Sequence, residues 1–85
     1  MLFYLVGIKG SAMSALAKIL YQEGHLVMGV DVLEDFYTSK DLNGIQLEDF
    51  DHMNLKDSYF YIIGNAFMNH DVTNYIMSKG WKYLS

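Results

Sequence analysis

The sequence has 85 residues, of which 52% are hydrophobic, and it carries a net charge of -4 at pH 7 with no proline and no cysteine. This composition fits a soluble globular chain and excludes a disulfide-rich fold and thiolate metal sites. At this length we expect one domain with a modest core, which gains stability when another domain or subunit covers one of its faces. The few Lys and Arg residues are scattered, so the sequence indicates no nucleic-acid partner.

The first expected element is a strand at residues 2–6, LFYLV, which is apolar on both faces as in a parallel sheet covered on both sides. It is far shorter than the roughly 20 residues that span a bilayer. It also lacks the basic leading segment and the small-residue cleavage site of a signal peptide. We therefore expect a buried strand and no membrane partner.

A helix is expected over residues 12–23. Met13, Leu16, Ala17 and Leu20 fall at the i, i+3, i+4, i+7 spacing of a buried helical stripe. Gly24 follows and can supply the left-handed residue that ends a helix.

The remaining elements alternate between strands and helices. HLVMGVDV at 25–32 predicts a second strand, parallel to the first because a helix separates them. The last helix, 69–80, should place Val72, Ile76 and Met77 on one face and end at Gly80. In chain order the other expected elements are a weak helical pattern at 34–44, a short strand at 45–50, a strand at 58–65 and a last strand at 81–85.

This order predicts an α/β fold, a Rossmann-like open, mostly parallel five-stranded sheet with helices on both faces. In such sheets ligands bind at the carboxyl ends of the strands, where the strand order reverses. The turn between the first strand and the first helix lies at that edge.

The turn from Gly7 to Met13 has features of a phosphate-binding loop. A helix N-terminus presents unpaired N–H groups and the positive end of the helix dipole, and glycine lets a phosphate approach the backbone. The three places of the dinucleotide fingerprint G-x-G-x-x-G hold Gly7, Lys9 and Ala12, with an additional Gly10. Lys9 puts a long cation where an ordinary NAD site has bare backbone, and it can itself meet a phosphate.

Asp31 lies 24 residues after Gly7, near the spacing at which an acid accepts hydrogen bonds from a ribose hydroxyl. Taken alone, a solvated acid after a strand explains it equally well. Together with the glycine turn, it favours a phosphate-bearing ligand.

The run VGIKGSAMSALAKIL resembles the start of the Mur ligases of peptidoglycan synthesis, and among them the UDP-N-acetylmuramate:L-alanine ligases, which read G-I-G/K-G-x-G-M-S-x-L-A. Ala12 stands where that family has glycine. GVDV looks like the family's G-S-D, DFDHMN is similar to its F-D-x-x-N segment, and IIGNAF looks like its G-N-A-F. The resemblance covers the whole chain.

The resemblance implies that residues 1–85 are the UDP-N-acetylmuramate-binding domain of a cytoplasmic, three-domain, ATP-dependent ligase that adds L-alanine to this UDP-sugar. ATP and magnesium are implied for the full-length ligase, in a central ATP-binding domain and a C-terminal domain absent from this chain. No G-x-x-G-K-T/S loop occurs in these residues, so we expect this chain to bind UDP-N-acetylmuramate without catalysing.

By position, the resemblance implies that the turn faces the diphosphate, with Ser14 donating to it, that Asp31 lies by the uridine, and that the end of the fourth strand borders the same pocket. Ordinary roles also fit: Ser14 as a first-turn polar residue, Asn65 as a turn former and Phe67 as a core aromatic. The candidate UDP-sugar-binding residues are Gly7, Ile8, Lys9, Gly10, Ser11, Ala12, Met13, Ser14, Asp31, Asn65, Ala66 and Phe67.

Two other functions stay open: a NAD-type dinucleotide domain and a standalone interaction domain with a vestigial nucleotide turn. His25, His52 and His70 are far apart in sequence and form no metal-binding pair, so we expect no metal site. Tyr59, Tyr61, Tyr75 and Trp81 mark an interface, with the missing ligase domains or in a homodimer, if they lie on an uncovered face.

Overall fold

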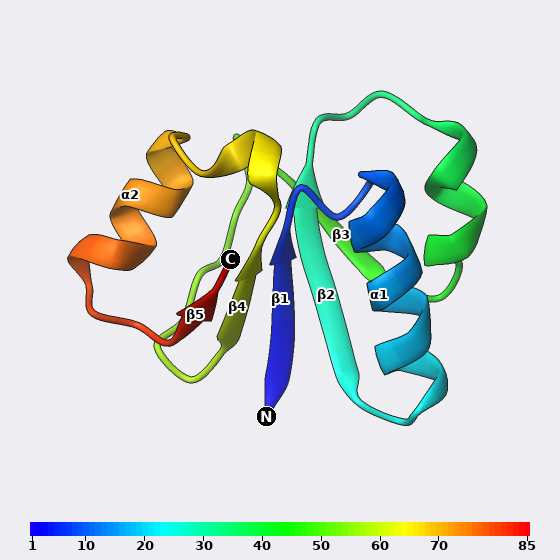
Figure 1. Cartoon of the computed structure of the whole chain (residues 1–85), viewed down its shortest axis with the longest axis horizontal. Coiled ribbons are helices and arrows are strands. Elements are labelled where there is room, and N and C mark those ends of the chain that lie inside the picture. The colour runs from blue at the N-terminus through cyan, green and yellow to red at the C-terminus, as the bar shows by residue number, and fades with distance from the viewer.

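The computed structural model describes residues 1–85 and consists of one five-stranded sheet between two helical layers (Figure 1). All strand pairs are parallel, so the sheet is parallel throughout rather than mostly so. The strands are β1 (Leu2–Val6), β2 (Leu26–Asp31), β3 (Gln46–Asp49), β4 (Phe60–Ile63) and β5 (Tyr83–Leu84). The helices are α1 (Ser11–Gln22) and α2 (Asp71–Ser78), with the 3-10 helices η1 (Tyr37–Leu42) and η2 (Asn65–Phe67).

The strand order is β3-β2-β1-β4-β5, so the chain builds outward from β1 to one edge and then returns to build toward the other. The strand order therefore reverses between β1 and β4. In Figure 1 the strands run in one direction between α2 on the left and α1 on the right. The predicted Rossmann-like α/β fold is confirmed.

The core has two layers, one on each face of the sheet, because successive side chains of a strand point to opposite faces. On the α2 side, Tyr4, Val30 and Tyr61 are buried beneath Val72 and Ile76. Part of this layer is covered by the irregular connection from β3 to β4, which contributes Phe50, Met53 and Leu55. The opposite layer packs the sheet against α1 and η1 through Leu5, Val27, Ile62, Ala17 and Leu42.

Most element boundaries agree with the predictions to within one or two residues. Gly24 and Gly80 follow α1 and α2 with φ of 89° and 69°, as expected of helix ends. The weak helical pattern becomes the 3-10 helix η1, and the last strand shortens to two residues.

The prediction that Met77 shares the buried face of α2 with Val72 and Ile76 was wrong. Met77 is 36% exposed, whereas Thr73 is fully buried and its hydroxyl donates to the carbonyl oxygen of Phe67 at 2.7 Å. Since that hydrogen bond satisfies the threonine hydroxyl, a polar residue takes the inward position.

The aromatic residues considered as an interface mostly belong to the core. Tyr61 is fully buried and Trp81 stacks on it with the ring centroids 5.7 Å apart. Tyr59 stacks on the buried Tyr4 at 5.8 Å. Of these four aromatic residues, only Tyr75 is exposed. A homodimer through these residues stays a prediction. Neither helix has the length and apolar character needed to cross a membrane.

Candidate functional site

A cleft of about 870 Å³ opens at the carboxyl ends of β1, β2 and β4, where the strand order reverses. One wall is the turn between β1 and α1, another is the loop after β2, and a third is the segment that follows β4. All but two of the predicted site residues line it: Gly7, Lys9, Gly10, Ser11, Ala12, Met13, Asp31, Asn65, Ala66 and Phe67.

The glycine turn is fixed to the end of β2 by its backbone. The N–H groups of Gly7 and Ile8 both donate to the carbonyl oxygen of Val30, at 2.9 and 3.3 Å. Gly7 has φ of 82°, a conformation that side-chain-bearing residues rarely adopt. The turn therefore needs glycine at its first place and delivers the chain directly into α1.

The N-terminus of α1 faces the cleft with unpaired donors. Gly10 is the N-cap residue and provides no side-chain cap, while Ser14 N–H closes the first turn by donating to the Gly10 carbonyl oxygen at 2.7 Å. The N–H groups of Ser11, Ala12 and Met13 have no hydrogen-bond partner within the chain. Three free donors at the positive end of a helix dipole form an environment suited to an anion.

Lys9 is buried and its ammonium group contacts the loop after β2. It donates to the carbonyl oxygens of Val32 at 2.8 Å and Glu34 at 2.7 Å. Two of its three N–H donors are thus directed at the loop after β2, and a contact between Lys9 and a phosphate stays a prediction. Lys9 joins the turn to the loop.

Asp31 lies at the end of β2 and is 5% exposed. One carboxylate oxygen accepts from the N–H of Lys9 at 2.9 Å and the other from the N–H of Val32 at 2.7 Å. Asp31 lines the cleft, and it also holds the backbone of the turn against the loop.

The other two predicted residues, Ile8 and Ser14, do not line the cleft. Ile8 is fully buried in the core layer beneath α1. Ser14 is also fully buried, and its hydroxyl donates to the Ser11 carbonyl oxygen at 3.1 Å. The ordinary explanation for Ser14, a polar residue of the first helical turn, describes its position.

Sequence reasoning missed the wall formed by the loop after β2 and the start of η1. Val32, Phe36, Tyr37 and Thr38 line the cleft. The signal for Phe36 and Tyr37 is that two large apolar residues stand in the weak helical pattern at 34–44 without forming a buried helical stripe. Six other lining residues were also missed: Leu16, Ile62, Ile63, Gly64, Leu84 and Ser85.

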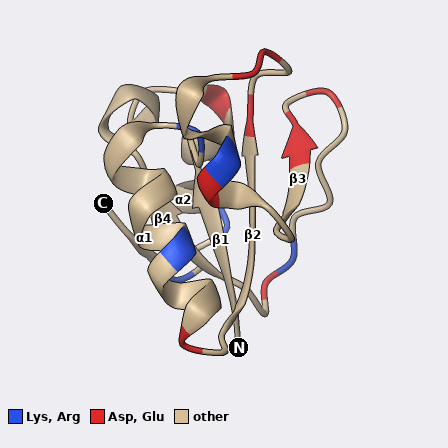
Figure 2. Ribbon diagram, turned by 90° about the vertical axis from the view of Figure 1, so that its right-hand side faces the viewer, with Lys and Arg blue, Asp and Glu red and all other residues tan.

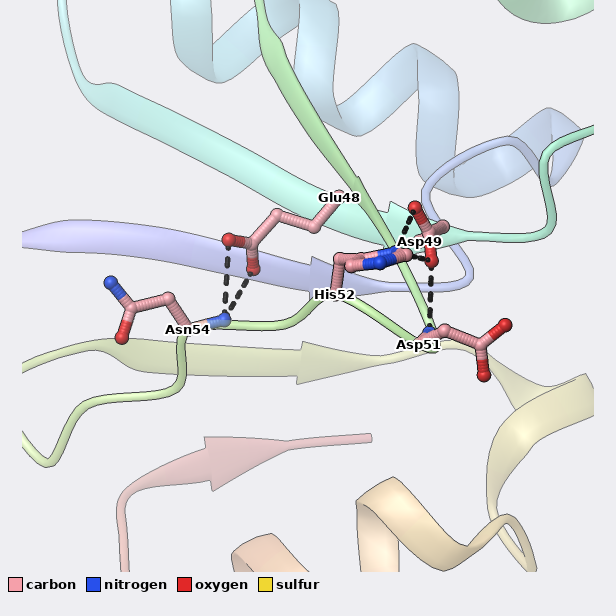
Figure 3. Close-up of polar contacts among 5 residues, drawn as sticks. All are labelled: Glu48, Asp49, Asp51, His52 and Asn54. Atoms are coloured by element: carbon pink, nitrogen blue, oxygen red, sulfur yellow. Dashed lines mark hydrogen bonds and ion pairs between the residues drawn. The ribbon is translucent and has the colours of Figure 1, made fainter.

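The segment that looks like F-D-x-x-N forms a separate polar cluster after β3 (Figure 3). The ring of His52 lies beside Asp49, with its Nδ1 2.9 Å from one carboxylate oxygen. This hydrogen bond raises the pKa of His52 and lowers the pKa of Asp49. The N–H of Asn54 donates to Glu48. No group of three or more His, Cys, Asp or Glu side chains is arranged to hold a metal ion.

Comparison with known proteins gives one family. The sequence model described as "Mur ligase family, catalytic domain" matches residues 2–79. The UDP-N-acetylmuramate--L-alanine ligase of Lacticaseibacillus casei (strain BL23) is 48% identical over 67 residues, which cover 76% of this chain and 15% of the relative. That of Streptococcus thermophilus (strain CNRZ 1066) is 40% identical over 85 residues, covering 95% of this chain and 19% of the relative.

The chain thus spans less than a fifth of the length of these relatives. No solved structure matches it. Because the family model covers nearly the entire chain and the identity to these ligases extends over most of it, the chain belongs to the Mur ligase family.

Proposed function

We propose that this chain is the UDP-N-acetylmuramate-binding domain of a ligase that joins L-alanine to UDP-N-acetylmuramate in peptidoglycan synthesis. The observation that supports this most directly is the row of unpaired N–H groups at Ser11, Ala12 and Met13, which opens onto the cleft. The names of the relatives supply the identity of the UDP-sugar and of the amino acid.

The turn matches the requirements of a diphosphate. Phosphate oxygens are strong acceptors, and their hydrogen bonds to backbone N–H groups are charge-assisted. A Cβ added at Gly10 would meet no atom of the chain closer than 3.4 Å, so the packing of the turn itself does not require glycine there. The missing side chain instead leaves the approach to the helix N-terminus open for the ligand.

ATP and magnesium belong, in this proposal, to other domains of a cytoplasmic parent ligase. Residues 1–85 contain no G-x-x-G-K-T/S loop to cradle the phosphates of ATP. The domain would hold and orient the UDP-sugar, while the carboxyl phosphate forms and reacts with L-alanine elsewhere. Alone, it should bind UDP-N-acetylmuramate and have no ligase activity.

The alternative ligand is a NAD-type dinucleotide, because the cleft lies where such cofactors bind in Rossmann-like sheets. The feature against it is Lys9 at the second fingerprint place, whose buried side chain spans from the turn to the loop after β2. A third possibility is an interaction domain that has lost nucleotide binding.

Calorimetric titration of the chain with UDP-N-acetylmuramate, and separately with NADH, distinguishes the three functions. We expect saturable binding of the UDP-sugar alone. Binding of NADH alone would indicate the dinucleotide domain, and binding of neither would indicate the interaction domain.

The variant Ser11→Pro probes the donors themselves. Proline is tolerated in the first turn of a helix, and Gly10, with ψ of 152°, already has the extended conformation that precedes proline. The substitution removes one free N–H and should weaken UDP-sugar binding about tenfold, the effect of one charge-assisted hydrogen bond. Asp71→Pro at the start of α2, where His70 has ψ of 151°, is the matched control and should leave binding unchanged.

A further inference from the structure

The segment 49–54, which looks like F-D-x-x-N, lines no part of the cleft, yet its Phe50 contacts one of the cleft walls from outside. The centroid of the Phe50 ring lies 5.3 Å from that of Phe67, which lines the cleft. The His70 ring lies 4.4 Å from Phe50 and 5.6 Å from Phe67. These half-buried rings form an aromatic cluster that joins the turn after β3, η2 and the N-cap of α2.

The turn that carries Phe50 is held by hydrogen bonds. β3 ends in Glu48 and Asp49, and Figure 2 shows acidic residues at the end of β3 and in the turn beyond it. The Asp49 carboxylate accepts from the N–H of Asp51 at 2.9 Å and lies 2.9 Å from Nδ1 of His52 (Figure 3). The N–H of His52 donates to the Asp49 carbonyl oxygen at 3.0 Å. Because Asp side chains stabilise turns in this way, the backbone on either side of Phe50 is fixed.

Phe67 connects the aromatic cluster to the glycine turn. Its carbonyl oxygen accepts from the N–H of His70 at 3.1 Å and from the hydroxyl of Thr73 at 2.7 Å, which fixes its backbone to the start of α2. Its ring lies over Gly7 and leaves no room there for a β-carbon. A phenyl ring has no hydrogen-bonding group, so packing alone decides its direction. Phe50 supplies part of that packing.

We propose that Phe50 is a positioning residue for the UDP-sugar cleft. It holds the Phe67 ring against Gly7, and so keeps the glycine turn and the segment after β4 at the separation that the ligand needs. Binding sites are held to within about 0.5 Å by residues whose rotamers are fixed by the packing around them. The inference rests on the proposed function and adds to it a residue that does not touch the ligand.

The test measures binding of UDP-N-acetylmuramate by the wild-type chain and three variants. Phe50→Leu keeps an apolar side chain but removes the ring, and it should weaken binding about three- to tenfold, the range that aromatic pair energies allow. Phe50→Tyr keeps the ring and should bind as the wild type does. Tyr59→Leu is the matched control. Tyr59 is also half-buried and stacks on Tyr4 in the same core layer, but it precedes β4 and so lies at the end away from the cleft. Tyr59→Leu should lose stability and keep wild-type affinity.

Proton NMR of Gly7 gives a readout that needs no ligand. The Phe67 ring should shift the two α-protons of Gly7 unequally, because it lies over one side of that residue. The difference between the two resonances should shrink in Phe50→Leu and persist in Phe50→Tyr and Tyr59→Leu.

Unchanged affinity in Phe50→Leu, or weaker binding with unchanged Gly7 protons, would overturn the positioning role and leave the proposed function standing. Equal weakening in Tyr59→Leu would also overturn it, because lost stability would then explain both variants. No binding of UDP-N-acetylmuramate to the wild-type chain would contradict both proposals.

Discussion

The ring of Phe67 covers Gly7 so closely that a β-carbon at Gly7 would lie 2.5 Å from Cδ2 of that ring. The contact joins the turn after β1 to the segment after β4, the two sides of the position where the strand order reverses. Gly7 therefore meets two requirements at once, a left-handed backbone conformation and the space that the ring occupies.

Gly7→Ala should lower the free energy of unfolding by about 3 kcal/mol. The left-handed conformation contributes about 1–2 kcal/mol and the overlap with Phe67 contributes the rest. Gly24→Ala is the control, because Gly24 also has positive φ, at 89°, but a β-carbon there meets nothing within 4 Å. It should cost about 1 kcal/mol. Urea unfolding measures both, and equal losses would show that Phe67 does not restrict Gly7.

Lys9→Met should destabilise the chain by about 2 kcal/mol, because it leaves the carbonyl oxygens of Val32 and Glu34 without their charged donor. Lys18→Met is the matched control. Lys18 lies 3.6 Å from Asp41 with half of its side chain exposed, so its loss should cost under about 0.5 kcal/mol. If thermal unfolding shifts equally in both variants, Lys9 does not hold the loop as its contacts indicate.

The ion pair of His52 and Asp49 predicts a pH-dependent contribution to stability. The raised pKa of His52 means that its contribution is complete below 6.5 and is lost as pH rises through the folded-state pKa. The lowered pKa of Asp49 means that its contribution is present above 3.8 and is lost as pH falls through the folded-state pKa. The pair therefore stabilises the fold in mildly acidic solution.

NMR titration of the His52 ring tests this assignment. The pKa should lie above 6.5 in the wild-type chain and fall toward that value in Asp49→Asn. Asp51→Asn removes only a more distant charge and should lower the pKa less. An unchanged His52 pKa in Asp49→Asn would contradict the hydrogen bond drawn in Figure 3.

Tyrosine burial predicts a loss of stability in alkaline solution. Burial raises the pKa of Tyr61 to about 12, although its hydrogen bond with the backbone of Lys56 lowers it somewhat. Burial and the hydrogen bond to Glu48 also raise the pKa of Tyr4 well above its usual value. Since both pKa values are raised by folding, the stabilisation is complete below pH 10 and is lost as pH rises above it.

Urea unfolding between pH 9 and pH 11 should show this decline, and Tyr61→Phe should make it shallower, because one of the two perturbed groups is removed. The substitution also removes the hydrogen bonds to Lys56, which changes the free energy of unfolding at every pH. The comparison therefore uses only how steeply the free energy of unfolding falls with pH. The same slope in both proteins would contradict the shifted pKa of Tyr61.

The fold was predictable because its strongest signals are local and repeated. The apolar strands, the stripe of Met13, Leu16 and Ala17, and the glycines at helix ends each indicate one element. The first and last residues of the edge strand β5 were harder to predict. It pairs on one side only, through two residues, so pairing rather than its sequence sets its length.

The turn residues of the cleft were predictable because the helix N-terminus and the glycines are contiguous in sequence. The directions in which the side chains of this turn point were not predictable from the sequence. Lys9 turns toward carbonyl groups more than twenty residues away, and Ser14 turns into its own helix. The wall at Phe36 and Tyr37 depends on how the loop after β2 folds back on the turn, which no local pattern encodes.

An amide NMR titration of the ¹⁵N-labelled chain with UDP-N-acetylmuramate probes the proposed diphosphate site at the turn residue by residue. We expect saturable shifts at Ser11, Ala12 and Met13, whose N–H groups are unpaired in the structure, and at Asn65 across the cleft. The amides of α2, on the opposite face of the sheet, should remain unchanged. Saturable binding that leaves the first turn of α1 unperturbed would contradict a diphosphate site at this turn, as would no response at millimolar ligand.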